Sequence, residues 1–177
     1  MVEIRPAEAE EYPLVREFCR RLAESAETPD TVPVPDDAAL KMAAELGAVY
    51  LCIASDRTSG LMILGDFTEG CAPVSGEGLP EDPAKTAELR FLGIIPEAAR
   101  DGLGTFMVKT ALAHCRAAGK QCVLAEVPEG NGDAEKFLLA MNFHRTDTNG
   151  AYPKGTPALS RKRFVFDLTE ADTGCCH

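Results

Sequence analysis

Hydrophobic and polar residues along the chain follow two periods, and the changes between them divide the sequence into elements. Alternation with a period of two predicts strands, and apolar residues three and four positions apart predict helices. The expected strands cover residues 2–5, 49–54, 60–67, 86–95, 121–127, 143–146 and 163–168. The expected helices cover residues 11–25, 37–46, 103–118 and 131–141. The predicted order is therefore β-α-α-β-β-β-α-β-α-β-β, with no internal repeat.

Residues that break the pattern predict where elements end. Pro13 fits a helix only in the first turn, and Asp36 or Asp37 can cap the second helix. Residues 55–59 predict a hairpin loop, and Asn142 can end a helix in the left-handed conformation. Three longer loops are expected at residues 28–35, 68–85 and 147–160. A loop as long as residues 68–85 is usually either functional or disordered.

The most informative stretch runs from Thr86 to Gly119, a strand followed by a glycine-rich turn that opens a helix. Such a turn exposes backbone N–H groups and the positive end of a helix dipole, so it predicts an anion site, with phosphate as the expected anion. The dinucleotide fingerprint needs a third glycine where Met107 stands, and no P-loop sequence is present.

Composition narrows the possible functions. The 177 residues carry a formal net charge of −10, which argues against nucleic-acid binding and suits a cationic acceptor such as an amine, or solubility alone. No secretory signal and no membrane-spanning apolar run are visible. Seven cysteines without a Cys-x-x-Cys pattern predict reduced thiols and no metal site, and hence a cytoplasmic protein.

The segment Pro96–Thr105 resembles the pyrophosphate loop of the GCN5-related N-acetyltransferase (GNAT) family, Arg/Gln-x-x-Gly-x-Gly/Ala after a strand. It departs at Ala99, where the family has Arg or Gln, and Arg100 stands one place later. The element order also resembles the family over residues 4–168. The resemblance implies an α/β fold (an α+β mixed sheet) with splayed fourth and fifth strands, a single domain over residues 1–168 and a mobile tail over 169–177.

The resemblance further implies a set of residues that bind acetyl-CoA. Main-chain groups at Leu92, Gly93 and Ile94 would pair with the pantetheine arm. The pyrophosphate would be held by Arg100, Asp101, Gly102, Leu103, Gly104 and Thr105. A second block resembles the family sequence Asn-x-x-Ala-x-x-Φ-Tyr, and implies contacts to the cofactor from Asn131, Ala134 and Phe137.

Two glutamates are candidates for the general base, because an amine arrives protonated and must lose a proton. Glu88 lies fourteen residues before Gly102, and Glu126 lies five residues before Asn131. Both positions resemble glutamates that serve as bases in the family, and Glu88 is slightly favoured. An equal alternative is that Glu88 is a carboxylate at the rim of the site or pairs with Arg90. Leu138 stands where the family has the tyrosine that protonates the departing thiolate, and Tyr152 is a candidate substitute.

The resemblance thus implies an N-acetyltransferase that moves acetyl from acetyl-CoA to a primary amine of a small molecule or peptide by direct attack. A non-catalytic acyl-CoA-binding regulatory module is the alternative, supported by Ala99 and Leu138, and a structural protein without cofactor is a third. The acceptor, the identity of the base, an acyl group other than acetyl and a homodimer all stay open. No nucleic-acid, membrane or metal partner is expected.

Overall fold

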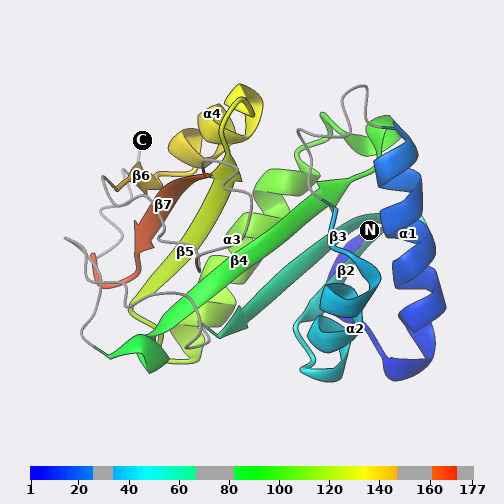
Figure 1. Cartoon of the computed structure of the whole chain (residues 1–177), viewed down its shortest axis with the longest axis horizontal. Coiled ribbons are helices and arrows are strands. Elements are labelled where there is room, and N and C mark those ends of the chain that lie inside the picture. Colours follow the sequence, from blue (N-terminus) through cyan, green and yellow to red (C-terminus); the bar gives the residue numbers. More distant parts are fainter. Residues whose placement is uncertain (26–33, 67–81, 147–160, 171–177) are drawn as a thin grey trace, which may run out of the picture. The chain divides into compact units, whose positions relative to one another are not determined.

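The structure is a computed structural model that describes residues 1–25, 34–66, 82–146 and 161–170. Figure 1 shows the elements in the predicted order, which is confirmed. The strands are β1 (Val2–Pro6), β2 (Val49–Ala54), β3 (Arg57–Asp66), β4 (Thr86–Ile94), β5 (Cys122–Pro128), β6 (His144–Arg145) and β7 (Arg161–Asp167). The helices are α1 (Tyr12–Ser25), α2 (Asp37–Glu45), α3 (Leu103–Ala117) and α4 (Gly132–Ala140), with short 3-10 turns η1 (Ala9–Glu11), η2 (Pro83–Lys85) and η3 (Pro96–Ala98).

The chain divides into two compact units. The first unit comprises residues 1–65 and 89–111, and the second comprises residues 66–88 and 112–177. Both β4 and α3 contribute residues to each unit. Hydrogen-bonded strands follow the order β1-β2-β3-β4 in the first unit and β4-β5-β7-β6 in the second. This is a mixed α/β sheet, as the sequence predicts.

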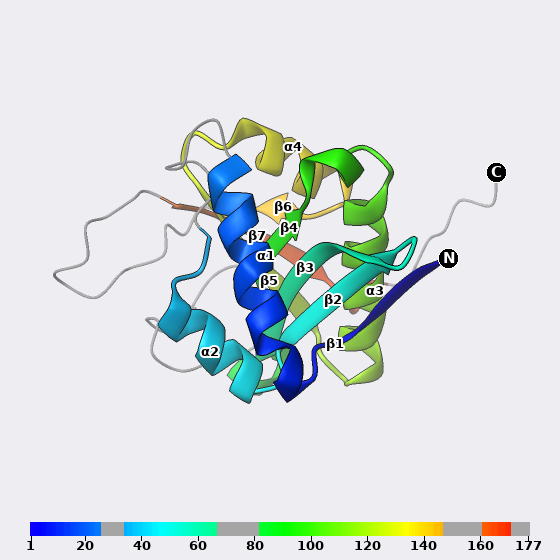
Figure 2. The same cartoon turned by 90° about the vertical axis from the view of Figure 1, so that its right-hand side faces the viewer.

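In the first unit, β1, β2 and β3 form an antiparallel meander in which Ile4 lies opposite Cys52 and Leu51 lies opposite Leu61. Helices α1 and α2 cover one face of this meander (Figure 2). Alternate strand residues point to that face, so the core forms where the helical stripe meets them. Its fully buried members include Val15, Leu40, Val49, Leu51 and Leu61.

The first half of α3 lies on the opposite side of the same strands (Figure 2). Its buried Met107 packs over Gly60 of β3, where an added Cβ would come within 2.7 Å of the methionine sulfur. Gly60 lies opposite Cys52, whose side chain alternates away from the α1–α2 face. The meander is therefore covered by helices on both faces.

The helix caps agree with the prediction from the sequence, whereas the hairpin turn differs from it. Asp36 caps α2 by accepting a hydrogen bond from the Ala39 N–H at 2.8 Å, and Asn142 adopts a φ of +66° after α4, as predicted. The expected five-residue loop at 55–59 is wrong. Only Ser55 and Asp56 form the turn, with φ values of +51° and +59°, because two left-handed residues match the twist of a tight hairpin. β3 therefore begins at Arg57.

In the second unit, β7 pairs antiparallel with β5 on one side and with β6 on the other, and α4 follows β5 (Figure 1). Cys122, Leu124 and Val165 form a buried cluster on one face of these strands. The rings of Phe143 and Phe166 stack at a tilt with centroids 5.4 Å apart. β7 begins two residues earlier than the alternation predicts.

Lys120 ties together the starts of β4 and β5 and the end of β3. Its Nζ lies 2.6 Å from Asp66 Oδ1 and donates to the Ala84 carbonyl at 2.7 Å, and its side chain is only 15% exposed. The neighbouring Gln121 N–H donates to the Lys85 carbonyl at 2.8 Å. Within the described residues, no helix is long and apolar enough to cross a membrane.

Candidate functional site

The end of β4 carries the three residues expected to pair with a pantetheine arm. Gly93 is buried, whereas Leu92 and Ile94 on either side are half-buried. An added Cβ at Gly93 would lie 2.4 Å from Leu22 Cδ1 and 2.8 Å from Phe91 Cζ, so a side chain there would force Leu22 of α1 and Phe91 to shift. The glycine thus lets α1 pack tightly at the point where β4 ends.

In the turn after β4, two of the backbone N–H groups that were expected to bind an anion are hydrogen-bonded within the turn itself. η3 covers Pro96–Ala98, and the Ala98 carbonyl accepts hydrogen bonds from the Arg100 and Asp101 N–H groups at 3.1 and 3.3 Å. Both residues are exposed. Their N–H groups are therefore engaged inside the turn, so an anion at this turn would depend on the residues that follow.

Gly102 changes the direction of the chain and opens α3. Its φ of +76° is in the left-handed region that favours glycine, and an added Cβ would meet nothing within 4 Å. The first backbone bond of α3 runs from the Phe106 N–H to the Gly102 carbonyl at 3.0 Å. The N–H groups of Leu103, Gly104 and Thr105 therefore precede the first helical hydrogen bond, as the donors of an anion cradle at a helix start do.

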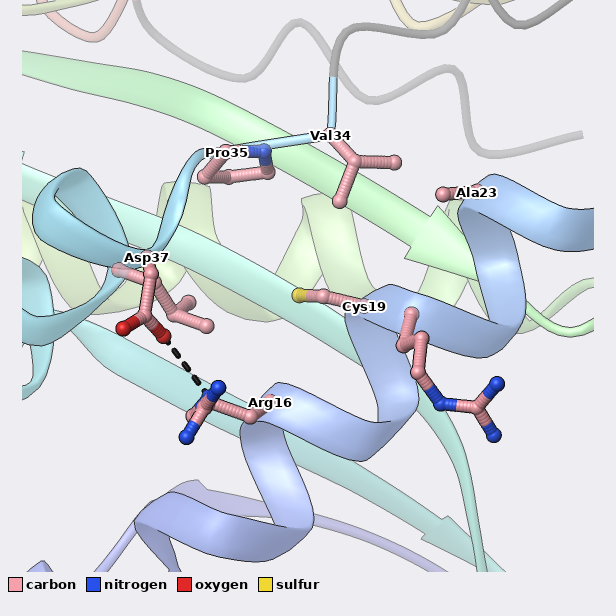
Figure 3. A pocket seen from close by; sticks show the side chains of 8 residues that line it. Arg16, Cys19, Ala23, Val34, Pro35 and Asp37 are labelled. Carbon is pink, nitrogen blue, oxygen red and sulfur yellow. Dashed lines mark ion pairs between the residues drawn. The ribbon is translucent and has the colours of Figure 1, made fainter.

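A cavity of about 300 Å³ lies between α1 and α2 (Figure 3). Cys19 points into it from α1, and the ion pair between Arg16 and Asp37, 2.8 Å long, closes one end. Burial raises the pKa of Cys19 to about 11, so this thiol stays protonated and unreactive near neutral pH. The cavity is a small, mostly apolar hollow without a nucleophile.

A second cavity of about 300 Å³ follows the end of β4 directly. It is lined by Arg21, Leu22, Glu24, Ser25, Ile95, Pro96 and Glu97. The Ile95 N–H donates to the Ser59 carbonyl at 3.0 Å, which fixes the chain at the wall of this cavity. Open volume with two carboxylates and one guanidinium therefore adjoins the residues expected to hold the pantetheine arm.

In the second unit, both candidate bases lie on one face of the strands. The Thr86 hydroxyl and the Cys122 thiol are 3.4 Å apart across β4 and β5, so these side chains share a face. Alternation places Glu88 on the same face as Thr86, and Glu126 on the same face as Cys122. Glu88 and Glu126 are both half-buried.

Glu126 also has a partner that the sequence did not predict. It lies directly opposite Arg163 in the β5–β7 register, and Arg163 Nη2 donates to Glu126 Oε1 at 3.0 Å. The side chains are 6% (Arg163) and 17% (Glu126) exposed, and Arg163 Nε is buried without a hydrogen-bond partner in the described structure. An unsatisfied buried donor costs about 1–3 kcal/mol. The signal that could have revealed this pair was an acidic residue in an otherwise apolar strand run and a basic residue in the last alternating run.

α4 holds the third group of predicted residues. Asn131 is its N-cap and accepts a hydrogen bond from the Ala134 N–H at 3.2 Å, so it has a structural task whatever else it contacts. Ala134 and Phe137 are half-buried. Leu138 is 5% exposed and packs in the interior, so no proton donor stands at that position. Tyr152 lies outside the described residues.

The acetyltransferase (GNAT) family model matches residues 26–143, more than half of the chain. The chain belongs to the GNAT family. The predicted recognition is thereby confirmed, and the glycine turn before α3 lies within the matched segment. No curated protein sequence matches the chain.

Solved GNAT structures have the same fold as this family member. The ribosomal-protein-S18-alanine N-acetyltransferase of Escherichia coli is 13% identical, with 98% of this chain and 98% of the other covered and a TM-score of 0.65. N-acetylglutamate synthase of Neisseria gonorrhoeae, solved with coenzyme A and N-acetyl-glutamate, is 15% identical, with 96% and 36% covered and a TM-score of 0.70. An acetyltransferase of Bacillus subtilis, solved with CoA, is 15% identical, with 94% and 99% covered and a TM-score of 0.65.

Proposed function

We propose that this GNAT protein is an acetyl-CoA-dependent N-acetyltransferase that acts on a primary amine of a small molecule or peptide. The observation that carries the proposal is the turn at Gly102, whose left-handed backbone places Leu103, Gly104 and Thr105 ahead of the first helical hydrogen bond of α3, inside the family's matched segment. Such a turn suits the pyrophosphate of CoA, because unpaired N–H groups at a helix start bind phosphate.

The pyrophosphate would lie against Leu103, Gly104 and Thr105, and the pantetheine arm would run along Leu92–Ile94. The cofactor supplies an activated thioester when bound. The chain's own part is to hold it by main-chain groups, so the side chains of Arg100 and Asp101 are free to point outward. Their exposure agrees with this arrangement.

The acceptor amine must be uncharged when it attacks the thioester carbonyl. Glu88 or Glu126 would take its proton, directly or through water; a C–N bond then forms, the C–S bond breaks, and CoA leaves as a thiolate. The thiolate needs little assistance, since the reference pKa of a thiol is about 8.5. The burial of Leu138 is therefore compatible with turnover, although it also suits a protein that binds acyl-CoA without transferring it.

The cavity beside Ile95 is the proposed approach of the acceptor. It adjoins the end of β4, and the Glu97 carboxylate on its wall would attract an ammonium group, whereas Glu24 already pairs with Arg20. We further propose that residues 1–168 act as one domain in the cytoplasm.

Binding is tested by thermal unfolding with acetyl-CoA. At about 100 times the dissociation constant the ligand should add about 2.7 kcal/mol of stability, which for a chain of this size raises Tm by roughly 5–10 °C. Gly102→Ala should weaken acetyl-CoA binding, because the new Cβ enters the cradle and strains the turn.

Gly47→Ala is the matched control. Gly47 also has a left-handed backbone, with φ of +66°, and an added Cβ there meets nothing within 4 Å. Both variants should lose about 1–2 kcal/mol of stability from backbone strain, but only Gly102→Ala should bind acetyl-CoA more weakly. Equal affinities of the two variants for acetyl-CoA would contradict a pyrophosphate site at the Gly102 turn.

Catalysis is tested separately by thiol release with a panel of amines. An enzyme releases CoA only when both substrates are present, and Glu88→Gln or Glu126→Gln should abolish release according to which carboxylate is the base. Binding of acetyl-CoA without thiol release from any amine would favour the acyl-CoA-binding module.

A further inference from the structure

The ion pair between Arg163 and Glu126 places a charged partner directly beside one candidate base. It joins directly opposite residues of β5 and β7, which run side by side in Figure 1. Neighbours on the same face are apolar, namely Leu124 and Val165. A guanidinium that is 94% buried among such residues is uncommon in proteins unless it is paired, as Arg163 is with Glu126.

Stability alone does not explain the pair. A buried ion pair adds little net stability over apolar residues of similar size, because desolvation offsets the attraction. Here one guanidinium nitrogen, Arg163 Nε, is also left buried and unpaired in the described structure. An apolar pair would avoid that penalty, so the charges are better explained by what they do to Glu126.

A second ion pair on the same strands shows the contrast. Lys162, the neighbour of Arg163 on β7, pairs with Glu135 of α4 at 2.8 Å, with side chains 19% and 20% exposed. Strand alternation turns Lys162 to the opposite face from Arg163. This pair connects a strand to a helix, whereas the Arg163 pair holds a carboxylate that lies on the face of the candidate bases.

We propose that Arg163 is a positioning residue for acetyl transfer, which fixes the orientation of the Glu126 carboxylate and places a counter-charge beside it. Fixed in this way, Glu126 orients the ammonium group of the acceptor, and a misdirected carboxylate binds the acceptor more weakly. The proposal rests on the proposed function for its effect on the reaction. Arg163 itself contacts neither substrate.

The test compares Arg163→Met, Arg163→Lys and the control Lys162→Met in the full chain. Arg163→Met should raise KM for the amine about tenfold, since loss of orientation by a positioning side chain costs at least that much. Its dissociation constant for acetyl-CoA should stay within about twofold of the wild-type value. Arg163→Lys keeps the positive charge and should recover part of the lost affinity for the amine, and Lys162→Met should leave KM for the amine unchanged.

A double-variant comparison decides whether Arg163 acts through Glu126. In a Glu126→Gln background, Arg163→Met should raise the dissociation constant for the amine no further, because the carboxylate that it orients is gone. This constant is measured without turnover, so the comparison holds even where Glu126→Gln abolishes thiol release. A full additional rise, or an equal rise in Lys162→Met, would overturn the proposal. If Arg163→Met does not fold, Arg163→Gln replaces it in the same comparison.

A structural readout separates this proposal from the proposed function. Crystal structures of Arg163→Met and Lys162→Met should show the Glu126 carboxylate reoriented or in several conformers in the first variant only. If wild-type protein acetylates no amine, the proposed function fails and this readout alone decides the role of Arg163. A Glu126 side chain that keeps one unchanged orientation in Arg163→Met would overturn it.

Discussion

Gly93→Ala is the substitution whose effect follows most directly from the structure. The new Cβ would lie 2.4 Å from Leu22 Cδ1 and 2.8 Å from Phe91 Cζ, both well inside contact distance. Leu22 and Phe91 are 8% and 7% exposed, so neither side chain can move outward into solvent without opening the core. Overpacking of this kind costs about 1–3 kcal/mol.

The magnitude can be checked by shortening the side chain that is in the way. Leu22→Ala alone should cost about 2–5 kcal/mol, because it leaves a cavity. In the double variant the alanine Cβ at position 93 occupies part of that cavity, so the combined loss should be smaller than the sum by about 1 kcal/mol or more.

Urea denaturation of the wild-type protein, both single variants and the double variant measures each free energy of unfolding. Gly93→Ala should also lower Tm by roughly 2–10 °C and weaken acetyl-CoA binding, because Leu92 and Ile94 must shift with it. Strict additivity of the two stability losses would refute the argument, since it would mean that Leu22 does not contact position 93.

Two further predictions concern titrating groups in the first unit. The hydrogen bonds from Arg5 lower the pKa of Glu11 from 4.5 to about 2, so the stability from this pair is present above pH 4.5 and is lost as pH falls through 2. The side chains are 32% (Arg5) and 23% (Glu11) exposed, so Glu11→Gln should cost only about 1 kcal/mol at pH 7 and clearly less at pH 2, where the carboxyl is partly protonated. Urea titrations measure both losses, and equal losses at the two pH values would contradict this. Burial raises the pKa of Cys19 to about 11, so at pH 8 a thiol reagent followed by mass spectrometry should label it roughly a hundredfold faster in urea than in the native protein; equal rates would contradict the burial.

Local patterns in the sequence predict the order of elements and most of their ends. The cap at Asp36 and the left-handed residue Asn142 depend only on their neighbours, and both are confirmed. The tight turn at Ser55 and Asp56 was not predicted, because neither residue is one of the usual glycine or asparagine signals for it. The pairing of β2 with β3 imposes the left-handed conformation on these two residues.

In the candidate site, too, features set by neighbouring residues could be predicted, and features set by distant ones could not. The glycine turn could be predicted because Gly102 marks it locally, whereas capture of the Arg100 and Asp101 N–H groups by Ala98 depends on a short 3-10 turn with no clear sequence signal. The Glu126–Arg163 pair needs the register between β5 and β7, which joins residues far apart in the sequence. Long-range register cannot be derived from one sequence by periodicity alone.

The tie made by Lys120 has a consequence for how the protein can vary during evolution. Asp66 and Ala84, on either side of the connection between β3 and β4, are both held by one lysine side chain that does not depend on the residues between them. Doubling the length of such a connection costs only about 0.6 kcal/mol of closure entropy. Insertions and deletions between these anchor points should therefore be tolerated with little effect on the strands, which lets this connection diversify while Glu88 and Glu126 keep their places.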